Sequence, residues 1–277
     1  MVRSHAGEPI FAMYYKLLKE NKSFLLSGFA GEDNPGPGKN KFWALDSKKK
    51  LEENLKNLPE DWYYRNHDVT YTVNSMGYRA PEFGNIDWKN SVVVFGCSTV
   101  FGDGVDDNDT MPAQLSKILN KPVINMGAGG SGIDWALHNS LILKEFYPNP
   151  LAVVHLWTDP SRITIYGHTP IRMGVWHKDY DQGLKTWIGT PGNIETYAYF
   201  TRLAAKHIWN KTSIYYDFSW SPQMVEITGC DNIPDESRTL DQPVGMAARD
   251  LCHQGKVPLG IIAEYVAKKL KTLGLNF

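Results

Sequence analysis

The sequence predicts an α/β fold with a mostly parallel central sheet and an irregular N-terminal extension. From residue 90 onward, short apolar runs alternate with helical segments, at roughly 30 residues per unit. Strands that alternate with helices in this way form parallel sheets joined by right-handed crossovers. The chain has 277 residues, of which 42% are hydrophobic. It is therefore long enough to bury one large core, with or without an appendage.

Residues 1–87 form the predicted extension, which we expect to pack on the core. It contains a short amphipathic helix from Pro9 to Lys19 and the loop GEDNPGPGKNK, in which glycine and proline disfavour regular structure. A highly charged helix is expected from Asp46 to Leu58. The run YTVNSMGYRAPEF follows, and it is β-like until Gly77 and Pro81 interrupt it.

Residues 88–277 form the predicted α/β domain. Its strands are expected at SVVVFG (91–96), KPVINMG (121–127), LAVVHLW (151–157) and SIYYDFSW (213–220). Its helices are expected from Thr110 to Asn120, Ile133 to Phe146, Ile194 to Trp209 and Val257 to Leu273, with Asp109 or Thr110 as the first N-cap. The last helix carries an apolar face of Leu259, Ile262, Ala263, Val266 and Leu270.

The segment after the third strand differs from the rest of this domain. Residues 160–192 are rich in Gly, Pro, Trp and Tyr and show no hydrophobic periodicity, and the next predicted helix begins after them. They begin at the end of a strand, where open α/β sheets bind ligands. We therefore expect this aromatic-rich insertion to cover the site and to set its specificity.

The composition argues against several classes of protein. Lys and Arg total 29 and Asp and Glu total 30, so the net charge is −1, and no nucleic-acid or membrane partner is expected. No signal-peptide pattern and no apolar run of about 18 residues is visible, which favours a cytoplasmic location. The three cysteines, Cys97, Cys230 and Cys252, are an odd number at no metal-like spacing, as in a reducing compartment. The oligomeric state is left open.

No cofactor and no metal is predicted. The residues that most resemble a metal-binding cluster are His177, Asp179 and Asp181. Polar loops often contain such triples, so a solvated loop is the preferred interpretation.

Two glycine-rich turns are candidates for the functional site. The first, in VVVFGCSTVFGDGV, is no Walker loop, because the position five after Gly96 is Phe101 and no lysine follows. The second, GAGGSG (127–132), satisfies GxGxxG after a strand and before a helix, with Asp159 at the end of the next strand as a ribose acid. A nucleotide-binding protein is therefore one alternative, although this turn follows the second strand of the domain.

A serine, a histidine and an aspartate support another interpretation. Asp250 and His253 lie three residues apart in ARDLCHQG, a spacing that one turn accommodates. The carboxylate can then accept the imidazole Nδ1–H and leave Nε2 as a base. Ser98, on the strand-to-helix turn after VVVF, completes a Ser-His-Asp set as the nucleophile.

From about Tyr71 to Leu270 the sequence resembles the SGNH (GDSL-type) hydrolases. The carriers of the resemblance are YTVNSMGYRAPEF, VVVFGCSTVFGDGV, VINMGAGGSGIDWAL and ARDLCHQG, in this order. The resemblance implies a three-layer flavodoxin-like sandwich with the site at the carboxyl ends of the strands. It also implies Ser98 as the nucleophile, Asp250 and His253 as its triad partners, and an oxyanion hole that includes the N–H groups of Ser98 and Gly130.

The sequence departs from that family at two places. Cys97 stands where the family has an Asp, and we expect its side chain to point away from Ser98 into the core. In HLWTDPSRI, Thr158 stands where the family has the oxyanion-hole Asn, and Asp159 follows it. We expect Asp159 to cap the next segment or to pair with Arg162, which leaves Thr158 as the remaining donor.

The predicted function is a serine esterase that removes small acyl groups, acetyl groups on a carbohydrate above all, without a cofactor. An acyltransferase would use the same residues. Trp157, Arg162 and Arg79 are the candidate substrate-binding residues, because they lie near the strand ends. The contrasting alternative is a non-enzymatic carbohydrate-binding or structural protein on the same fold.

Overall fold

A five-stranded parallel sheet lies at the centre of the molecule. The structure, a computed structural model, describes residues 25–29, 35–165, 171–174, 182–238 and 244–277. The strand order is β4-β3-β5-β8-β9, and every neighbouring pair is parallel. The strands are β3 (Val92–Gly96), β4 (Val123–Gly127), β5 (Ala152–Trp157), β8 (Ile214–Ser219) and β9 (Asp231–Asn232). The predicted α/β class with a parallel central sheet is confirmed.

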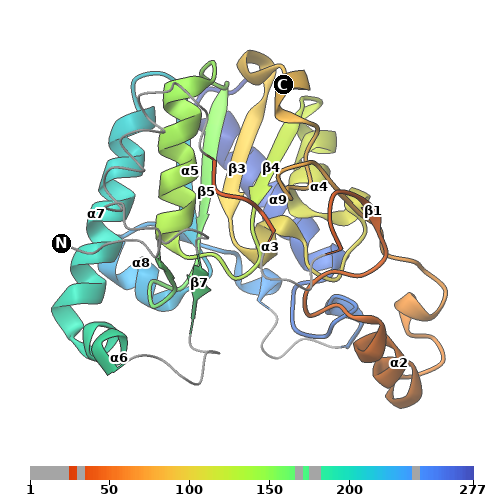
Figure 1. Cartoon of the computed structure of the whole chain (residues 1–277). Coiled ribbons are helices and arrows are strands. Elements are labelled where there is room, and N and C mark those ends of the chain that lie inside the picture. The colour runs from red at the N-terminus through yellow and green to blue at the C-terminus, as the bar shows by residue number, and fades with distance from the viewer. Residues whose placement is uncertain (1–24, 30–34, 166–170, 175–181, 239–243) are drawn as a thin grey trace, which may run out of the picture.

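Helices cover both faces of the sheet, so the core has three layers (Figure 1). One face carries α5 (Ile133–Phe146) and α7 (Pro191–Trp209), and the other carries α4 (Met111–Leu119) and α9 (Lys256–Thr272). Side chains alternate along β3. Val93 and Phe95 belong to the core on the α5 side, and Val92 and Val94 belong to the core on the α9 side. The alternation explains why the strand is apolar throughout.

The helix ends follow the local sequence. Thr110 is the N-cap of α4, and its hydroxyl accepts a hydrogen bond from the N–H of Ala113 at 3.2 Å. Along α9 the predicted apolar face is fully buried: Leu259, Ile262, Ala263, Val266 and Leu270. None of the helices that the structure describes is long and apolar enough to cross a membrane.

The topology places a binding edge between β3 and β5. From β3 the chain passes to β4 on one side and then to β5 on the other. Open α/β sheets bind ligands at such a switch point, outside the carboxyl ends of the strands. Gly96 pairs with both Gly127 and Leu156, so the three strands end at the same level. The residues that follow them, Ser98 and Thr158 included, therefore share one edge.

The described part of the N-terminal segment packs near this edge. It contains β1 (Gly38–Asn40), which pairs antiparallel with β2 (Tyr71–Val73), and α2 (Lys48–Asn57). The Trp43 ring stacks on Phe101, with centroids 5.2 Å apart, and Asn54 Nδ2 donates to the carbonyl of Arg249 at 2.8 Å. The charged helix and the β-like run are thus confirmed, whereas the helix predicted from Pro9 to Lys19 lies outside the described residues.

Several short elements were not predicted. The insertion contains an antiparallel hairpin, β6 (Ile163–Ile165) with β7 (Ile171–Met173), and the helix α6 (Gln182–Gly189). The helix α7 begins at Pro191, three residues before the predicted start, and α8 (Pro222–Thr228) precedes β9. Apart from α7, which was predicted, these elements have two to eight residues, which is too short for a hydrophobic period to identify them.

Candidate active site

Ser98 lies in a tight turn at the carboxyl end of β3. It is the first residue of the short helix α3 (Ser98–Phe101) and is 7% exposed. Gly102 and Gly104 follow in the left-handed region, with φ of 86° and 78°, a conformation that favours glycine. The N–H of Asp103 donates back to the carbonyl of Ser98 at 3.2 Å. The glycines of this stretch therefore close the turn that displays the serine.

Arg79 stabilises this turn from inside the protein and does not face a substrate site. Its side chain is 3% exposed and pairs with Asp107 at 2.7 Å. Its guanidinium also donates to the carbonyls of Gly102 at 2.7 Å and Val105 at 3.0 Å. Further bonds go to the carbonyls of Thr70 and Phe101. The prediction that Arg79 binds substrate is wrong, because backbone carbonyls and Asp107 occupy its donors.

The second glycine turn packs against the first. A Cβ on Gly127 would lie 2.2 Å from the backbone N of Phe101, and one on Gly132 would lie 2.4 Å from the carbonyl oxygen of Arg162. One N–H group in the first turn of α5 is also occupied, since Trp135 N donates to Asp134 Oδ1 at 2.8 Å. A carboxylate therefore stands where a pyrophosphate would bind. Close backbone packing explains GAGGSG, and the nucleotide-binding alternative loses its support.

Gly130 presents a free donor at the same edge. It adopts φ of 70°, and its N–H takes part in no hydrogen bond within the described residues. The neighbouring carbonyl of Gly129 accepts from Arg172 Nη1 at 2.6 Å. Arg172 lies over the Trp135 ring at 4.1 Å and donates to the carbonyl of Gly28 at 2.9 Å. The insertion strand β7 thus fixes the loop that carries Gly130.

Asp250 and His253 form a hydrogen-bonded pair before α9. His253 Nδ1 lies 2.6 Å from Asp250 Oδ2. The other carboxylate oxygen accepts from the N–H groups of Cys252 at 2.9 Å and His253 at 3.2 Å. Leu251 between them adopts φ of 58°, so the pair sits in a tight turn. The carboxylate is fully buried and fixes the orientation of the imidazole.

The loop that carries this pair lies directly on the Ser98 turn. Arg249 N donates to the carbonyl of Gly104 at 2.9 Å, and Thr99 Oγ1 donates to Gln254 Oε1 at 3.2 Å. A buried ion pair also holds the loop, because Arg249 Nη2 lies 2.8 Å from Asp46 Oδ2. The structure therefore brings Ser98, Asp250 and His253 into one region from opposite ends of the domain.

A second carboxylate faces the other ring nitrogen of His253. Asp103 Oδ2 lies 3.8 Å from His253 Nε2, and its side chain is 4% exposed. Burial raises the pKa of Asp103 to about 6, although His253 opposes that shift. Burial lowers the pKa of His253, but the Asp250 hydrogen bond and the charges of Asp103 and Asp250 outweigh it and raise the pKa to about 9. Nothing in the sequence analysis singled out Asp103.

Cys97 is buried, but it does not point away from Ser98. The hydroxyl of Ser98 donates to Cys97 Sγ at 3.9 Å. Burial opposes ionisation of this thiol, but Arg162 and hydrogen bonds from the Thr99 N–H and from Thr158 outweigh burial and lower its pKa. Alternation along a strand does not apply at this position, because Cys97 has left β3 and precedes a helix with φ of −93° and ψ of −148°. The expectation for its direction is wrong.

The segment after β5 contains three further candidate residues, and their side chains have different surroundings. Thr158 is 3% exposed, and its buried hydroxyl makes no well-formed hydrogen bond with any described residue. Asp159 Oδ1 accepts from the N–H of Ser161 at 2.8 Å, so its predicted capping role is confirmed. Arg162 lies over the Trp220 ring at 5.2 Å and is partly buried near Cys97.

Trp157 is a core residue. It is 1% exposed, stacks on His155 at 4.5 Å and donates from Nε1 to Asp217 at 3.0 Å. A ring in this position offers no face to a ligand. The prediction that Trp157 binds substrate is therefore wrong, because the side chain of the last strand residue turns inward.

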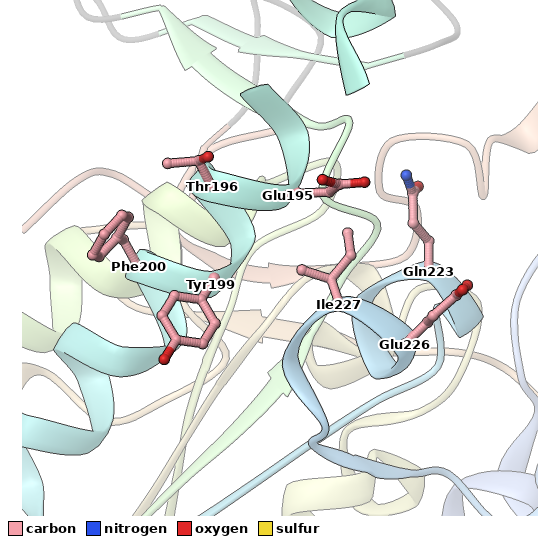
Figure 2. A pocket seen from close by; sticks show the side chains of 7 residues that line it. All are labelled: Glu195, Thr196, Tyr199, Phe200, Gln223, Glu226 and Ile227. Atoms are coloured by element: carbon pink, nitrogen blue, oxygen red, sulfur yellow. The ribbon is translucent and has the colours of Figure 1, made fainter. Parts of the chain in front are cut away.

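A separate groove of about 540 Å³ lies between α7 and α8. Figure 2 shows the residues that line it: Glu195, Thr196, Tyr199, Phe200, Gln223, Glu226 and Ile227. None of them belongs to the candidate site. Within the described residues no group of three His, Cys, Asp or Glu side chains is arranged to hold a metal, and the His177 cluster lies outside them.

No protein-family model and no curated protein matches the chain. Similar solved structures include the psychrotrophic esterase EstA from Pseudoalteromonas sp., which is 13% identical, with 68% of this chain and 100% of that chain covered and a TM-score of 0.43. AlinE4, an SGNH-hydrolase family esterase, is 15% identical, with 67% and 99% covered and a TM-score of 0.33. The acetyl xylan esterase Est2A from the rumen bacterium Butyrivibrio proteoclasticus is 11% identical, with 76% and 68% covered and a TM-score of 0.39. Values this low support no conclusion about activity.

Proposed function

We propose that this protein is a serine esterase in which Ser98, His253 and Asp250 form the catalytic set. The observation that carries the proposal is the Asp250–His253 pair, with its fully buried carboxylate and its 2.6 Å contact at Nδ1, packed against the turn that displays Ser98. A carboxylate bound to Nδ1 fixes the tautomer in which Nε2 is the base. An Asp–His pair without a function would more often lie on the surface, where water solvates both side chains. Here the carboxylate is buried beside a strand-to-helix turn.

The reaction follows from these groups. His253 Nε2 takes the proton of Ser98 Oγ, which attacks the ester carbonyl, and the imidazolium then protonates the departing alcohol. Water, activated by the same nitrogen, releases the acyl group from Ser98. An acyltransferase would differ only in using an acceptor alcohol in place of water. In the free protein the Ser98 hydroxyl donates to Cys97, and catalytic hydrogen bonds often tighten only once substrate binds.

Three donors are available for the oxyanion. The N–H of Gly130 has no hydrogen-bond partner within the described residues. The hydroxyl of Thr158 lies near the Cys97 thiol but makes no well-formed hydrogen bond with a described residue, and the N–H of Ser98 lies at the first position of α3. An unpartnered buried hydroxyl is costly unless a ligand uses it. Asp159 does not oppose the oxyanion, because its carboxylate is turned to the N–H of Ser161. Thr158 is thus our candidate for the third donor.

The substrate is proposed to carry a small acyl group. Ser98 and Thr158 are 7% and 3% exposed, so a short acyl chain fits the space near them better than a long one. We favour an acetyl ester of a carbohydrate, because the aromatic-rich insertion begins beside the site and aromatic rings suit sugar faces. Arg162, next to the Trp220 ring, is the remaining candidate for a substrate contact.

The proposal is tested by labelling with a fluorophosphonate probe, which reacts with an activated serine whatever the substrate. We expect the native protein and Cys252→Ala, which removes an exposed thiol, to be labelled, and Ser98→Ala and His253→Ala not to be. Hydrolysis of p-nitrophenyl acetate should follow the same order. A native protein that resists the probe at all pH values from 6 to 10 would favour the binding-protein alternative. Labelling that survives Ser98→Ala would move the nucleophile elsewhere.

A further inference from the structure

The imidazole of His253 lies between two buried carboxylates. Asp250 contacts Nδ1 at 2.6 Å, and Asp103 Oδ2 lies 3.8 Å from Nε2. The two carboxylate side chains are 0% and 4% exposed, whereas that of His253 is 15% exposed. A base in a Ser-His-Asp set needs a free Nε2 lone pair that faces the serine. Here a second negative charge stands on that side of the ring.

The position of Asp103 is fixed by its backbone. The residue lies between Gly102 and Gly104, both in the left-handed region, and its N–H donates to the carbonyl of Ser98. A Cβ on Gly129 would lie 3.3 Å from Asp103 Oδ2, so any larger residue there would crowd the carboxylate. Oδ1 is buried and has no hydrogen-bond partner among the described residues. Within the part of the chain that the structure describes, His253 is the one basic side chain that lies within 4.0 Å of this carboxylate.

The charged neighbours support the same conclusion. The groups that act on Asp103 or His253 are Asp46, Tyr71, Arg79, Cys97, Arg172 and Asp250. Of the two arginines, Arg79 is engaged by Asp107 and backbone carbonyls, and Arg172 by the carbonyls of Gly129 and Gly28. The remaining groups are acidic or neutral. A proton held by His253 is thus the nearest compensation for the charge of Asp103.

We propose that Asp103 is a positioning residue whose charge keeps a proton on Nε2 of His253 and so prevents this nitrogen from acting as the base for Ser98. This inference rests on the proposed function. Ser98 and Asp103 compete for one nitrogen, and the Ser98 hydroxyl accordingly donates to Cys97 in the free protein. The site becomes active when His253 loses its proton, or when a bound substrate weakens its contact with Asp103.

The sign of the pH dependence follows. An imidazole is neutral, and can act as a base, only above its pKa. With a pKa of about 9, only about 1% of His253 is neutral at pH 7. Activity should therefore rise with pH up to about 9. Removing the charge of Asp103 lowers the pKa of His253 and moves this rise to lower pH, so activity at pH 7 increases.

The test measures the pKa of His253 directly, by NMR titration of protein labelled with ¹⁵N in its histidines. The His253 signals are those missing from His253→Ala. We expect Asp103→Asn to lower the pKa of His253 by about 1 or more, as expected for removal of one nearby opposite charge. The control Asp109→Asn removes a carboxylate that pairs with Lys256 at 3.2 Å and should leave the pKa unchanged. An unchanged pKa in Asp103→Asn would overturn the proposal.

Asp103→Ser serves as a second variant that removes the charge with a smaller side chain. If neither variant folded, the proposal would also fail, because it gives Asp103 no role in stability. In parallel, the rate of fluorophosphonate labelling of Asp103→Asn at pH 7 should rise about tenfold over the native protein. A lowered pKa without any labelling of either protein would refute the esterase and leave the role of Asp103 intact. Slower labelling at a lowered pKa would show that Asp103 assists the reaction, and would overturn its assignment as a restraint.

Discussion

Replacing Arg79 by alanine tests whether this residue braces the nucleophile turn. The substitution removes the Arg79 donor to the carbonyl of Val105, and it leaves the carbonyl of Gly102 with only the N–H of Val105 at 3.4 Å. Each buried carbonyl left without a donor costs about 1–3 kcal/mol. The Asp107 side chain is 29% exposed, so water can compensate its charge and it adds little. We expect a loss of about 3 kcal/mol or more in the free energy of unfolding.

The assay is urea unfolding followed by tryptophan fluorescence. The matched control is Arg65→Ala, since Arg65 also donates to carbonyls, those of Leu55 and Pro59, but lies nearer the surface and far from Ser98 in sequence. We expect its loss to be at most half as large. If Arg79→Ala lost less than about 1 kcal/mol while the KM for p-nitrophenyl acetate rose, the brace would be refuted and Arg79 would be a substrate contact after all.

Three further predictions concern the site. Asp250→Asn should lower kcat for p-nitrophenyl acetate by about 10⁴, because an amide donates to Nδ1 and moves the ring proton to Nε2; a loss below tenfold would contradict the pair's role. Thr158→Ala should lower kcat by about tenfold or more, whereas Asp159→Asn should change it less than about threefold; a reversed order would mean that Asp159 faces the oxyanion. Gly127→Ala should destabilise the fold by more than about 2 kcal/mol, because its Cβ would meet Phe101 N at 2.2 Å, and Gly189→Ala, with open space around it, should not.

The fold was predictable because each long element carries a period or a cap in its own sequence. The helix α5 begins and ends at the predicted residues, and Thr110 caps α4 as expected. The misses are elements such as α8, whose seven residues are shorter than two helical turns. Their structure depends on contacts with β8 and α7 rather than on local sequence.

The parts of the site that a short sequence motif defines were predictable. The parts that depend on contacts between distant segments were not. The turn that holds Asp250 and His253 could be inferred from their spacing of three. Arg79 and Trp157 lie near the strand ends in sequence, but their side chains point into the protein. Asp103 is absent from any sequence-based prediction, because only the fold brings position 103 against position 253.

The cysteine before Ser98 and the carboxylate of Asp103 belong to one charge balance. The resembling family has an Asp where this chain has Cys97. Asp103 already lies within the field of Asp250 and Asp46, which raise its pKa and so oppose its ionisation. A further carboxylate at position 97 would act in the same direction, since like charges in a buried site disfavour each other's ionised form. In this chain the Cys97 thiol lies in the same field, and its charge, like that of Asp103, raises the pKa of His253. The substitution at position 97 and the second carboxylate at His253 are therefore two parts of a single arrangement of charge around Ser98.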